Sequence, residues 1–334
     1  MKTKLYDMTK EIDPAKLKEV AQLLKQGELV AFPTETVYGL GADARQEIAV
    51  RNIFTAKGRP SDNPLIVHVA TKEQLFSLVK NVPDYVEQLI DRFSPGPITY
   101  VLPSNQKVAP TVTANLATVG VRIPDHPVAL ALLQEVNLPI AAPSANRSGR
   151  PSPTEASHVL EDLSGRIKAI VDGGRTDVGI ESTVLHCTGA IPGILRPGWM
   201  KAKDIKEVVG DCHVYQAKES PQEPKSPGMK YTHYAPEVPL FLVKKDKLKE
   251  TLSHYQREGK RVALLYESDS LAKEEATVVQ QVAEAEFEIG RRLYRLLRSF
   301  TKAEVDLILW EYPSVTKEAA IVDRLERAAT KIIR

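Results

Sequence analysis

The sequence predicts an α/β fold in two domains, the larger built on a twisted mixed sheet and the smaller a Rossmann-like unit at the C-terminal end. Helical and strand patterns alternate along the chain, which is typical of α/β proteins. The 334 residues, 43% of them apolar, exceed what one hydrophobic core normally supports. A polar, proline-rich stretch at 217–228 indicates a linker. We therefore divide the chain into residues 1–210, a linker at 211–237 and residues 238–334.

The first helix is marked at both ends. Asp13 can cap it with Pro14 at the first helical position, apolar residues then recur on one face, and Gly27 can end it. Gly58, which follows the basic residue Lys57, marks the end of the next helix, because glycine is common just after a helix. In chain order we expect a strand at 29–32, a helix at 47–57 and a strand at 64–69.

Several later strands follow one another without an intervening helix, so the sheet should be mixed rather than purely parallel. Thr154 is placed to cap a helix. The expected strands are 99–102, 119–123, 139–142, 169–171, 182–186 and 194–196, and the expected helices are 84–93, 127–136 and 154–163.

Beyond the linker, strands and helices alternate in the way that βαβ units do. We expect strands at 240–243, 262–266 and 307–310 and helices near 247–257, 280–299 and 317–332.

Composition restricts the function. A formal charge of +2 gives no long-range field of the kind that marks a dedicated nucleic-acid binder, so any anion site must be local. Cys187 and Cys212 are too few for a disulfide framework and lack a metal-ligand spacing, which favours a reducing cytosolic location. The N-terminal segment lacks a signal-peptide core and no run of 18 apolar residues occurs, which argues against secretion and membrane spanning.

The run AKGRPSDNPLIVHV, residues 56–69, places Lys57, Arg59, Asn63 and His68 around a turn that leads into a strand. This pattern favours an anion-binding corner. Two other interpretations stay open: the cations can simply complement a helix C-terminus, and a histidine among apolar strand residues is more often a core residue than a ligand.

Gly39 and Gly41 match a dinucleotide-binding fingerprint only in spacing, because six residues separate them from the preceding strand. We instead expect them to allow close backbone approach in a loop, with Thr34 and Thr36 offering hydroxyl groups. No Walker loop, HExxH motif, GxSxG elbow or kinase signature occurs.

Two further features favour anion binding. Residues 143–154 are rich in hydroxyl groups before a helix, which fits either a phosphate-binding nest or an ordinary polar loop with a cap. Arg122 and Arg196 stand at strand ends, where a guanidinium group can bind a carboxylate or phosphate with two hydrogen bonds.

The runs FPTETVYGLGA, AKGRPSDNPLIVHV, SPGPITYVL, VGVRIPDHP, AAPSANRSGRPSPT, GIESTVL and ILRPG, from about residue 15 to 236, together resemble the YrdC-domain family of threonylcarbamoyl-AMP synthases. SPGMKYTHYAP and the α/β tail resemble its two-domain form. The resemblance implies a YrdC-like catalytic domain with a basic cleft. It also implies a nucleotidyltransferase that makes L-threonylcarbamoyladenylate from L-threonine, bicarbonate and ATP, with release of pyrophosphate, as the first step of threonylcarbamoyladenosine formation at tRNA position 37.

The same resemblance assigns residues. It implies that Lys57, Arg59 and His68 belong to the catalytic centre, and that Mg²⁺ arrives with ATP rather than in a protein metal site. Residues expected to contact ATP are Lys57, Arg59, Asn63, Thr118, Ser144, Ser152, Arg196 and Tyr234. Those expected to contact L-threonine are Thr36, His68, Arg122, Ala142 and Ser182.

Residues 229–236 in the linker carry aromatic and basic side chains that a spacer does not need, and we expect them to act as a lid over the nucleotide site. The downstream tRNA threonylcarbamoyl-transfer machinery is the implied partner, and tRNA itself is a further candidate. Two rivals stay open: a module that binds double-stranded RNA or tRNA without chemistry, and a synthase of another carbamoyl or acyl adenylate.

Overall fold

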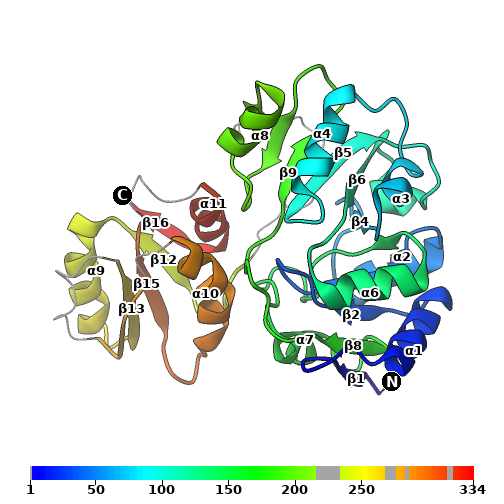
Figure 1. Ribbon diagram of the computed structural model, residues 1–334. Helices are drawn as coiled ribbons and strands as arrows, with labels where there is room; N and C mark the ends of the chain where they lie inside the picture. Colours follow the sequence, from blue (N-terminus) through cyan, green and yellow to red (C-terminus); the bar gives the residue numbers. More distant parts are fainter. Residues whose placement is uncertain (1, 216–233, 268–275, 283–285, 314–318) are drawn as a thin grey trace. The chain divides into compact units, whose positions relative to one another are not determined.

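The computed structural model describes residues 2–215, 234–267, 276–282, 286–313 and 319–334 (Figure 1). The chain forms two compact units. The first comprises residues 1–148 and 152–230, and the second comprises residues 149–151 and 231–334.

The first unit is built on one mixed sheet with the strand order β1-β8-β2-β3-β7-β4-β6-β5-β9-β10-β11. The sheet contains parallel pairs, such as β4 with β6, and antiparallel pairs, such as β5 with β6, which confirms the predicted mixed sheet. Its strands are β1 (Lys4–Asp7), β2 (Val30–Phe32), β3 (Gly39–Asp43), β4 (Ile66–His68), β5 (Ile98–Pro103), β6 (Thr118–Arg122), β7 (Ile140–Ala141), β8 (Ala169–Asp172), β9 (Thr183–His186), β10 (Gly193–Arg196) and β11 (His213–Val214). Its helices are α1 (Pro14–Lys25), α2 (Glu47–Lys57), α3 (Lys72–Phe76), α4 (Asp84–Phe93), α5 (Pro110–Thr113), α6 (Pro127–Val136), α7 (Ala156–Leu163) and α8 (Ala202–Val209).

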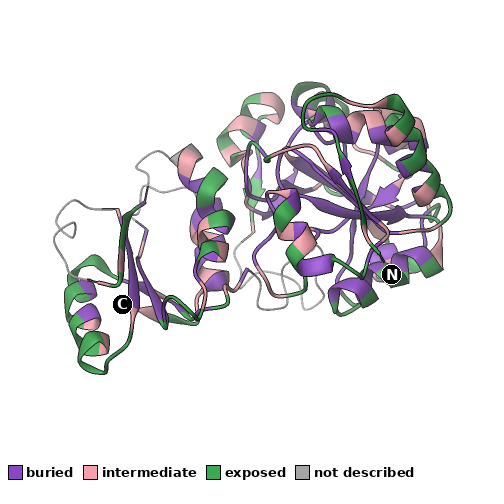
Figure 2. Cartoon of the chain, turned by 90° about the horizontal axis from the view of Figure 1, so that it is seen from below, coloured by how far each residue is buried: buried purple, intermediate pink, exposed green. Residues whose placement is uncertain are grey.

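Successive strand residues point to opposite faces of this sheet, and each face has its own core. On one face, Ala31 and Ala141 pack with apolar residues of α2, α4, α5, α7 and α8. On the other, Val30 and Ile140 pack with α1 and α6. Figure 2 shows the strands buried between these helices.

One part of the second face carries polar side chains instead. Val67, Tyr100 and Val121 point into the core beside α2 and α4. Their strand neighbours His68, Thr99 and Arg122 therefore point to the opposite face. Among the described residues, none from β4, β5, β6 or β9 joins the core beside α1 and α6. Here the polar side chains lie beside a small apolar cluster of Val101, Val184 and Leu195, outside the two larger cores.

The glycines of β3 correct one prediction. Gly39 and Gly41 lie in a strand rather than a loop, although the expected close approach is present. A Cβ atom on Gly41 would lie 2.8 Å from Cε1 of Phe32 and 2.9 Å from Cγ2 of Ile140. The strand can use glycine here because packing across the sheet, and not strand propensity, decides which residue fits.

A second correction concerns α7. The helix begins at Ala156 with Glu155 in the cap position, so Thr154 is not its cap. Thr154 is buried, and its backbone N–H donates to Nδ1 of His158 at 3.3 Å. The cap residue Glu155 makes no side-chain hydrogen bond to the first turn of the helix.

The second unit contains a parallel sheet with the order β14-β13-β15-β12-β16, as its predicted βαβ pattern requires. Two predicted helices were too long, because residues 280–281 belong to β14 and residues 331–332 to β16. The elements are β12 (Leu240–Val243), α9 (Lys245–Arg257), β13 (Val262–Tyr266), β14 (Val278–Gln281), α10 (Glu286–Ser299), β15 (Leu307–Glu311), α11 (Ala319–Ala328) and β16 (Lys331–Ile333). Across the described residues of both units, no helix combines the length and apolar character needed to cross a membrane.

Candidate functional site

Neighbouring strands bring the predicted residues to one level of the sheet. β4 and β6 end at His68 and Arg122, which are register partners. β5 runs antiparallel to β6, and β9 runs parallel to β5, so both begin at the level where β4 and β6 end. Ser182 directly precedes β9, and Arg196 ends β10, which runs antiparallel to β9. Strand direction therefore forms a row of polar side chains from residues far apart in sequence.

Arg122 is the fixed point of this row. Its side chain is almost fully buried, with 4% of the residue exposed. Its Nη1 donates to Oγ1 of Thr36 at 2.9 Å and its Nε donates to the carbonyl oxygen of Gly96 at 3.3 Å. Its Nη2 lies 2.6 Å from Oε2 of Glu35 in an ion pair. These contacts fix the guanidinium plane before any ligand is bound.

A turn at residues 34–37, directly after β2, presents two of these partners. Oγ1 of Thr34 accepts the backbone N–H groups of Thr36 and Val37, both at 3.2 Å, and donates to the carbonyl oxygen of Val37 at 2.7 Å. A threonine that closes its own turn in this way is a common local motif. The side chains of Glu35 and Thr36 consequently stand next to Arg122.

His68 is neutral in this environment. Burial, and secondarily the charge of Arg122, lower the pKa of its imidazole to about 3. Its Nδ1 has no hydrogen-bond partner among the described residues, and its ring meets Phe32 edge-on with centroids 6.0 Å apart. An uncharged imidazole with an unused nitrogen atom can accept or donate one hydrogen bond to a ligand.

Ser182 and Arg196 form the other end of the row. Nη2 of Arg196 donates to the carbonyl oxygen of Ser182 at 2.9 Å and to its Oγ at 3.2 Å. The same hydroxyl group lies 2.8 Å from Oγ1 of Thr99. Ser182 therefore links a predicted phosphate-binding arginine to the strand beside Arg122.

The ammonium group of Lys57 is held by hydrogen bonds to backbone carbonyl oxygens. Its Nζ donates to the carbonyl oxygens of Ser144 and Asn146, the latter at 2.6 Å, and only 3% of the residue is exposed. Its own carbonyl oxygen accepts the N–H of Ser148 at 2.8 Å. The ammonium group thus ties the end of α2 to the loop at 144–148.

Arg59 and Asn63 lie in the turn that follows α2. Gly58 adopts the left-handed conformation, with φ of 63°, and ends the helix. Arg59 is half-buried, and its Nη2 approaches the carbonyl oxygens of Asn63 and Pro64 at 3.4 Å. Asn63 is 1% exposed, and both atoms of its amide group lack a hydrogen-bond partner within the described chain. Such an amide has capacity for a ligand.

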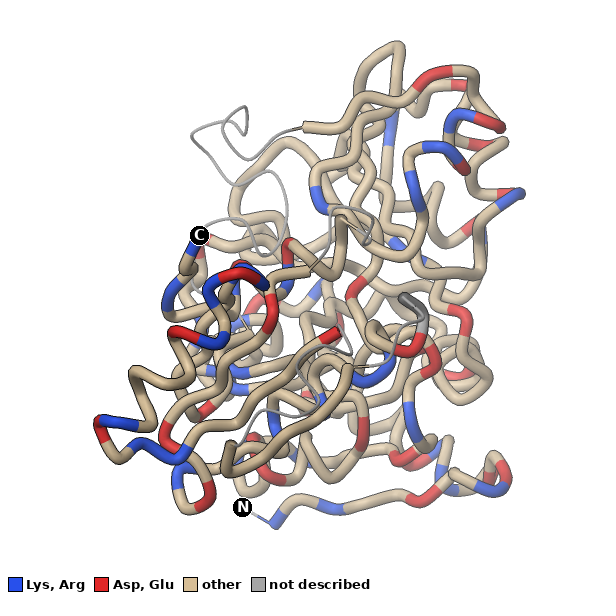
Figure 3. The backbone as a smooth tube through the Cα atoms, turned by 90° about the vertical axis from the view of Figure 1, so that its left-hand side faces the viewer, with Lys and Arg blue, Asp and Glu red and all other residues tan. Residues whose placement is uncertain are grey.

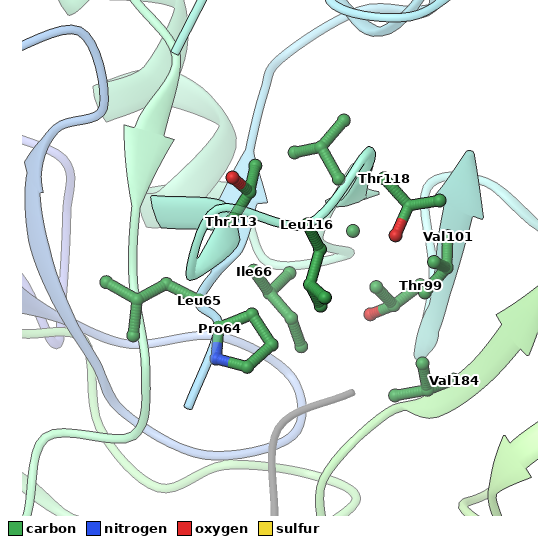
Figure 4. Close-up of a pocket in the computed structure, with 11 residues that line it drawn as sticks. Pro64, Leu65, Ile66, Thr99, Val101, Thr113, Leu116, Thr118 and Val184 are labelled. Carbon is green, nitrogen blue, oxygen red and sulfur yellow. The ribbon is translucent and has the colours of Figure 1, made fainter. Parts of the chain in front are cut away.

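Thr118 lies on the same face as Arg122, four residues earlier along β6, beside a small pocket (Figure 4). Gly120 lies between them on β6. A Cβ atom at this position would lie 3.3 Å from Cγ2 of Thr99, so glycine allows the two strands to pack closely here. The walls combine aliphatic side chains with threonine hydroxyl groups, which suits a group with an apolar face and polar edges. The lining residues are Pro64, Leu65, Ile66, Thr99, Val101, Thr113, Leu116, Thr118, Val119, Gly120 and Val184.

The remaining predicted residues have separate settings. Oγ of Ser152 donates to Oε1 of Glu181 at 2.6 Å. Ala142 is buried beside β4, and its N–H donates to the carbonyl oxygen of Ile66 at 2.9 Å. Tyr234 belongs to the second unit, where its ring stacks on Tyr294 with centroids 5.2 Å apart. Residues 229–233 of the predicted lid lie outside the described residues.

Sequence reasoning missed two buried carboxylates, Glu35 and Glu181. Both stand inside the motif runs FPTETVYGLGA and GIESTVL, flanked by threonine or serine. An acidic residue beside small hydroxyl residues inside a motif run was the available signal. In the part of the chain that the structure describes, no group of three or more His, Cys, Asp or Glu side chains could hold a metal ion.

Figure 3 shows basic and acidic positions interspersed along the backbone. At the site itself, Arg122 pairs with Glu35, Arg196 donates to Ser182, and Glu181 accepts from Ser152. This mixture of fixed cations and acceptors can bind an anion or a molecule that carries both charges.

Family models match both units. One, described as "Telomere recombination" and covering Sua5, YciO and YrdC proteins, matches residues 22–198. The other, described as "Threonylcarbamoyl-AMP synthase, C-terminal domain", matches residues 200–330.

Similar proteins match over almost the whole chain. The Bacillus subtilis threonylcarbamoyl-AMP synthase is 47% identical over 98% of each chain. The Pyrococcus abyssi protein of the same name is 43% identical, again over 98% of each chain. A crystal structure of Pyrococcus abyssi Sua5 complexed with L-threonine superposes with a TM-score of 0.93 at 42% identity and covers 99% of each chain.

Proposed function

The chain belongs to the Sua5/YrdC family of threonylcarbamoyl-AMP synthases, and on this premise we propose that it makes L-threonylcarbamoyladenylate from L-threonine, bicarbonate and ATP. Water is lost when bicarbonate joins the amine, pyrophosphate leaves the α-phosphate, and the transfer of the adenylyl group makes the enzyme a nucleotidyltransferase. The adenylate then supplies the first intermediate for threonylcarbamoyladenosine on tRNA. The observation that carries the proposal is the 47% identity with a synthase over 98% of both chains.

The row of polar residues suits this reaction. Arg122, already fixed by Thr36 and Gly96, presents N–H groups to the carboxylate of threonine. The hydroxyl groups of Thr36 and Ser182 and the neutral imidazole of His68 can receive the remaining polar groups of the amino acid. The carbonyl oxygen of Ala142 adds an acceptor.

The chemical difficulty is that two anions must meet. The carbamate of threonine attacks the α-phosphate, and like charges about 4 Å apart repel by about 4 kcal/mol at an effective dielectric constant near 20. Arg59 and Arg196 offset this repulsion at the nucleotide phosphates, and Asn63 offers its buried amide. Lys57 adds its positive charge at the loop that carries Ser144. Catalysis is then mainly positioning, without a covalent enzyme intermediate.

Mg²⁺ enters this scheme with ATP. Bound to phosphate oxygens, the ion would neutralise charge on the triphosphate. The row offers hydroxyl groups and guanidinium groups rather than a cage of carboxylates, and this donor set fits a metal ion held by the nucleotide. Two buried thiols, Cys187 and Cys212, support our proposal that the enzyme works in a reducing cytosol.

Pyrophosphate release from Mg-ATP tests the function, with threonine and bicarbonate each present or omitted. Release that needs both substrates supports the proposal. Release with another amino acid in place of threonine would favour a different carbamoyl or acyl adenylate synthase. A protein that releases none, yet retains double-stranded RNA or tRNA with a steep dependence on salt, would be a binding module instead.

A further inference from the structure

The ion pair between Glu35 and Arg122 has unusual geometry. Oε2 of Glu35 lies 2.6 Å from Nη2 of Arg122, yet neither atom has a hydrogen-bond partner in the described chain. The two charges are in contact, but the N–H bond does not point at the oxygen atom. Oε1 of Glu35 lacks a partner as well. Both carboxylate oxygens therefore keep their acceptor capacity.

Burying the two carboxylate oxygens of Glu35 without hydrogen-bond donors costs free energy. Only 4% of Glu35 is exposed, and an ionised carboxylate that water does not reach needs several donors. The turn at 34–37 holds the residue in this position through Thr34, whose hydroxyl group closes the turn. The fold thus maintains an acceptor beside an arginine instead of turning the side chain out to solvent.

A zwitterionic amino acid complements such a pair. Its ammonium and carboxylate groups are attached to one carbon atom, so they reach neighbouring groups of opposite charge together. We propose that Glu35 binds the α-ammonium group of the amino-acid substrate while Arg122 binds its carboxylate. The inference rests on the proposed function, because it assigns an additional residue to the same amino-acid site. It makes Glu35 a determinant of specificity for a free amino group.

A purely structural role gives a different expectation. If Glu35 only positions Arg122, its loss weakens every ligand that presents a carboxylate to that arginine. If Glu35 binds the ammonium group, its loss weakens only ligands that carry one. The pair L-threonine and 3-hydroxybutanoate separates these cases, since the second compound is threonine without its amino group.

The experiment measures the affinity of both compounds by calorimetry, in the presence of Mg²⁺ and a non-hydrolysable ATP analogue. We expect Glu35→Gln to weaken L-threonine roughly 10- to 100-fold, as for the loss of a hydrogen bond to a charged group. The affinity for 3-hydroxybutanoate should stay the same or improve. An equal loss for both compounds, or an unchanged affinity for threonine, would overturn the proposal.

Two further variants complete the design. Glu35→Asp keeps the charge and should retain a preference for threonine over 3-hydroxybutanoate; losing that preference would count against the proposal, and this variant serves if Glu35→Gln does not fold. Glu155→Gln removes another partly buried acid, paired with Arg175 at the start of α7, and should change neither affinity. Wild-type protein that binds no threonine would reject the proposed function itself, whereas normal wild-type binding with an unchanged Glu35→Gln variant rejects only this inference.

Discussion

Arg122 shows how much one side chain depends on its fixed surroundings. Three neighbours, Glu35, Thr36 and Gly96, hold the guanidinium group in one plane. Arg122→Lys keeps the charge but loses this fork. We expect the affinity for threonine to fall by about tenfold, with a much smaller effect on ATP, because one lost charge-assisted hydrogen bond corresponds to about 1.4 kcal/mol or more.

Arg196→Lys is the matched comparison for that measurement. Its guanidinium group lies at the other end of the row, on Ser182, and should affect ATP more than threonine. Separate calorimetric titrations with ATP and with threonine measure the two affinities for each variant. Equal losses for ATP and threonine in the Arg122 variant would contradict the assignment.

The lowered pKa of the buried His68 imidazole predicts that the stability of the folded protein depends on pH. The pKa of its imidazole is about 3 in the folded protein and about 6.5 when unfolded. The unfolded chain therefore binds more protons between these values, so this stabilisation is complete above pH 6.5 and is lost as the pH falls toward 3. Between pH 6.5 and 5, the contribution of His68 to the free energy of unfolding should fall by about 2 kcal/mol.

Urea unfolding at several pH values measures this contribution. The drop in free energy of unfolding on acidification should be smaller by that amount in His68→Asn, which has no titrating ring. Other titrating groups act equally in both proteins, so the difference isolates His68. Parallel curves for the two proteins would show that the imidazole is not held neutral.

At the scale of single elements, β3 and the end of α2 use glycine for different reasons. Gly41 faces Phe32 and Ile140 at distances too short for a Cβ atom. Gly41→Ala should therefore lower the free energy of unfolding by about 1–3 kcal/mol through overpacking. Gly58 has open space around it but a φ of 63°, so Gly58→Ala should cost only about 1 kcal/mol.

Urea denaturation compares these two variants. A smaller effect at Gly41 than at Gly58 would show that β3 shifts to admit the methyl group. A second change, Ile140→Ala, removes Cγ2 of Ile140, which is one of the two clashing atoms. If the steric explanation holds, the double variant should lose less free energy of unfolding than the sum of the two single variants.

Elements with strong local signals were predictable from sequence. Asp13 caps α1 through the backbone N–H groups of Ala15 and Lys16, and Gly58 ends α2 as its position indicated. The short strand β1 was missed because only one of its four residues is buried, and β11 because both of its two residues are exposed, so neither shows an apolar pattern. Thr154 was predicted as the cap of α7, but the helix begins two residues later, with Glu155 at the cap position, because the start of a helix cannot be placed to the residue from hydroxyl-rich sequence alone.

The candidate site was predictable only in part. Arginines at strand ends and the hydroxyl-rich loops pointed to the residues that the fold assembles in a row. Glu35 was not selected, since its importance depends on contact with Arg122, a residue 87 positions later that pairs with it only through the sheet. The roles of the individual residues in binding ATP and threonine stay predictions.

At the scale of the whole molecule, Tyr234 tests the lid proposal. Its ring stacks on Tyr294 and lies 5.9 Å from the guanidinium carbon of Arg324. If residues 229–236 cover the nucleotide, Tyr234→Ala should weaken ATP binding and shorten the lifetime of the adenylate, because water then reaches it. Quenched-flow measurement of adenylate decay gives the lifetime.

Tyr255→Ala is the control for that change. It removes an aromatic ring that packs against Phe241 in the same unit, with centroids 5.7 Å apart. Both variants should lower the stability of the second unit, but only Tyr234→Ala should alter the adenylate lifetime. If both change it, loosening of the unit and not loss of a cover is responsible; if neither does, the lid proposal is wrong.

The row of polar residues also constrains how the enzyme can be made. Thr36, His68, Arg122, Ser182 and Arg196 meet only because β5 and β9 start where β4 and β6 end. A chain emerging from the ribosome has no complete row until β10, which carries Arg196, has been synthesised and has paired with β9. Ligand binding can therefore stabilise only nearly complete catalytic units, since any shorter fragment lacks part of the row and gains nothing from threonine or ATP.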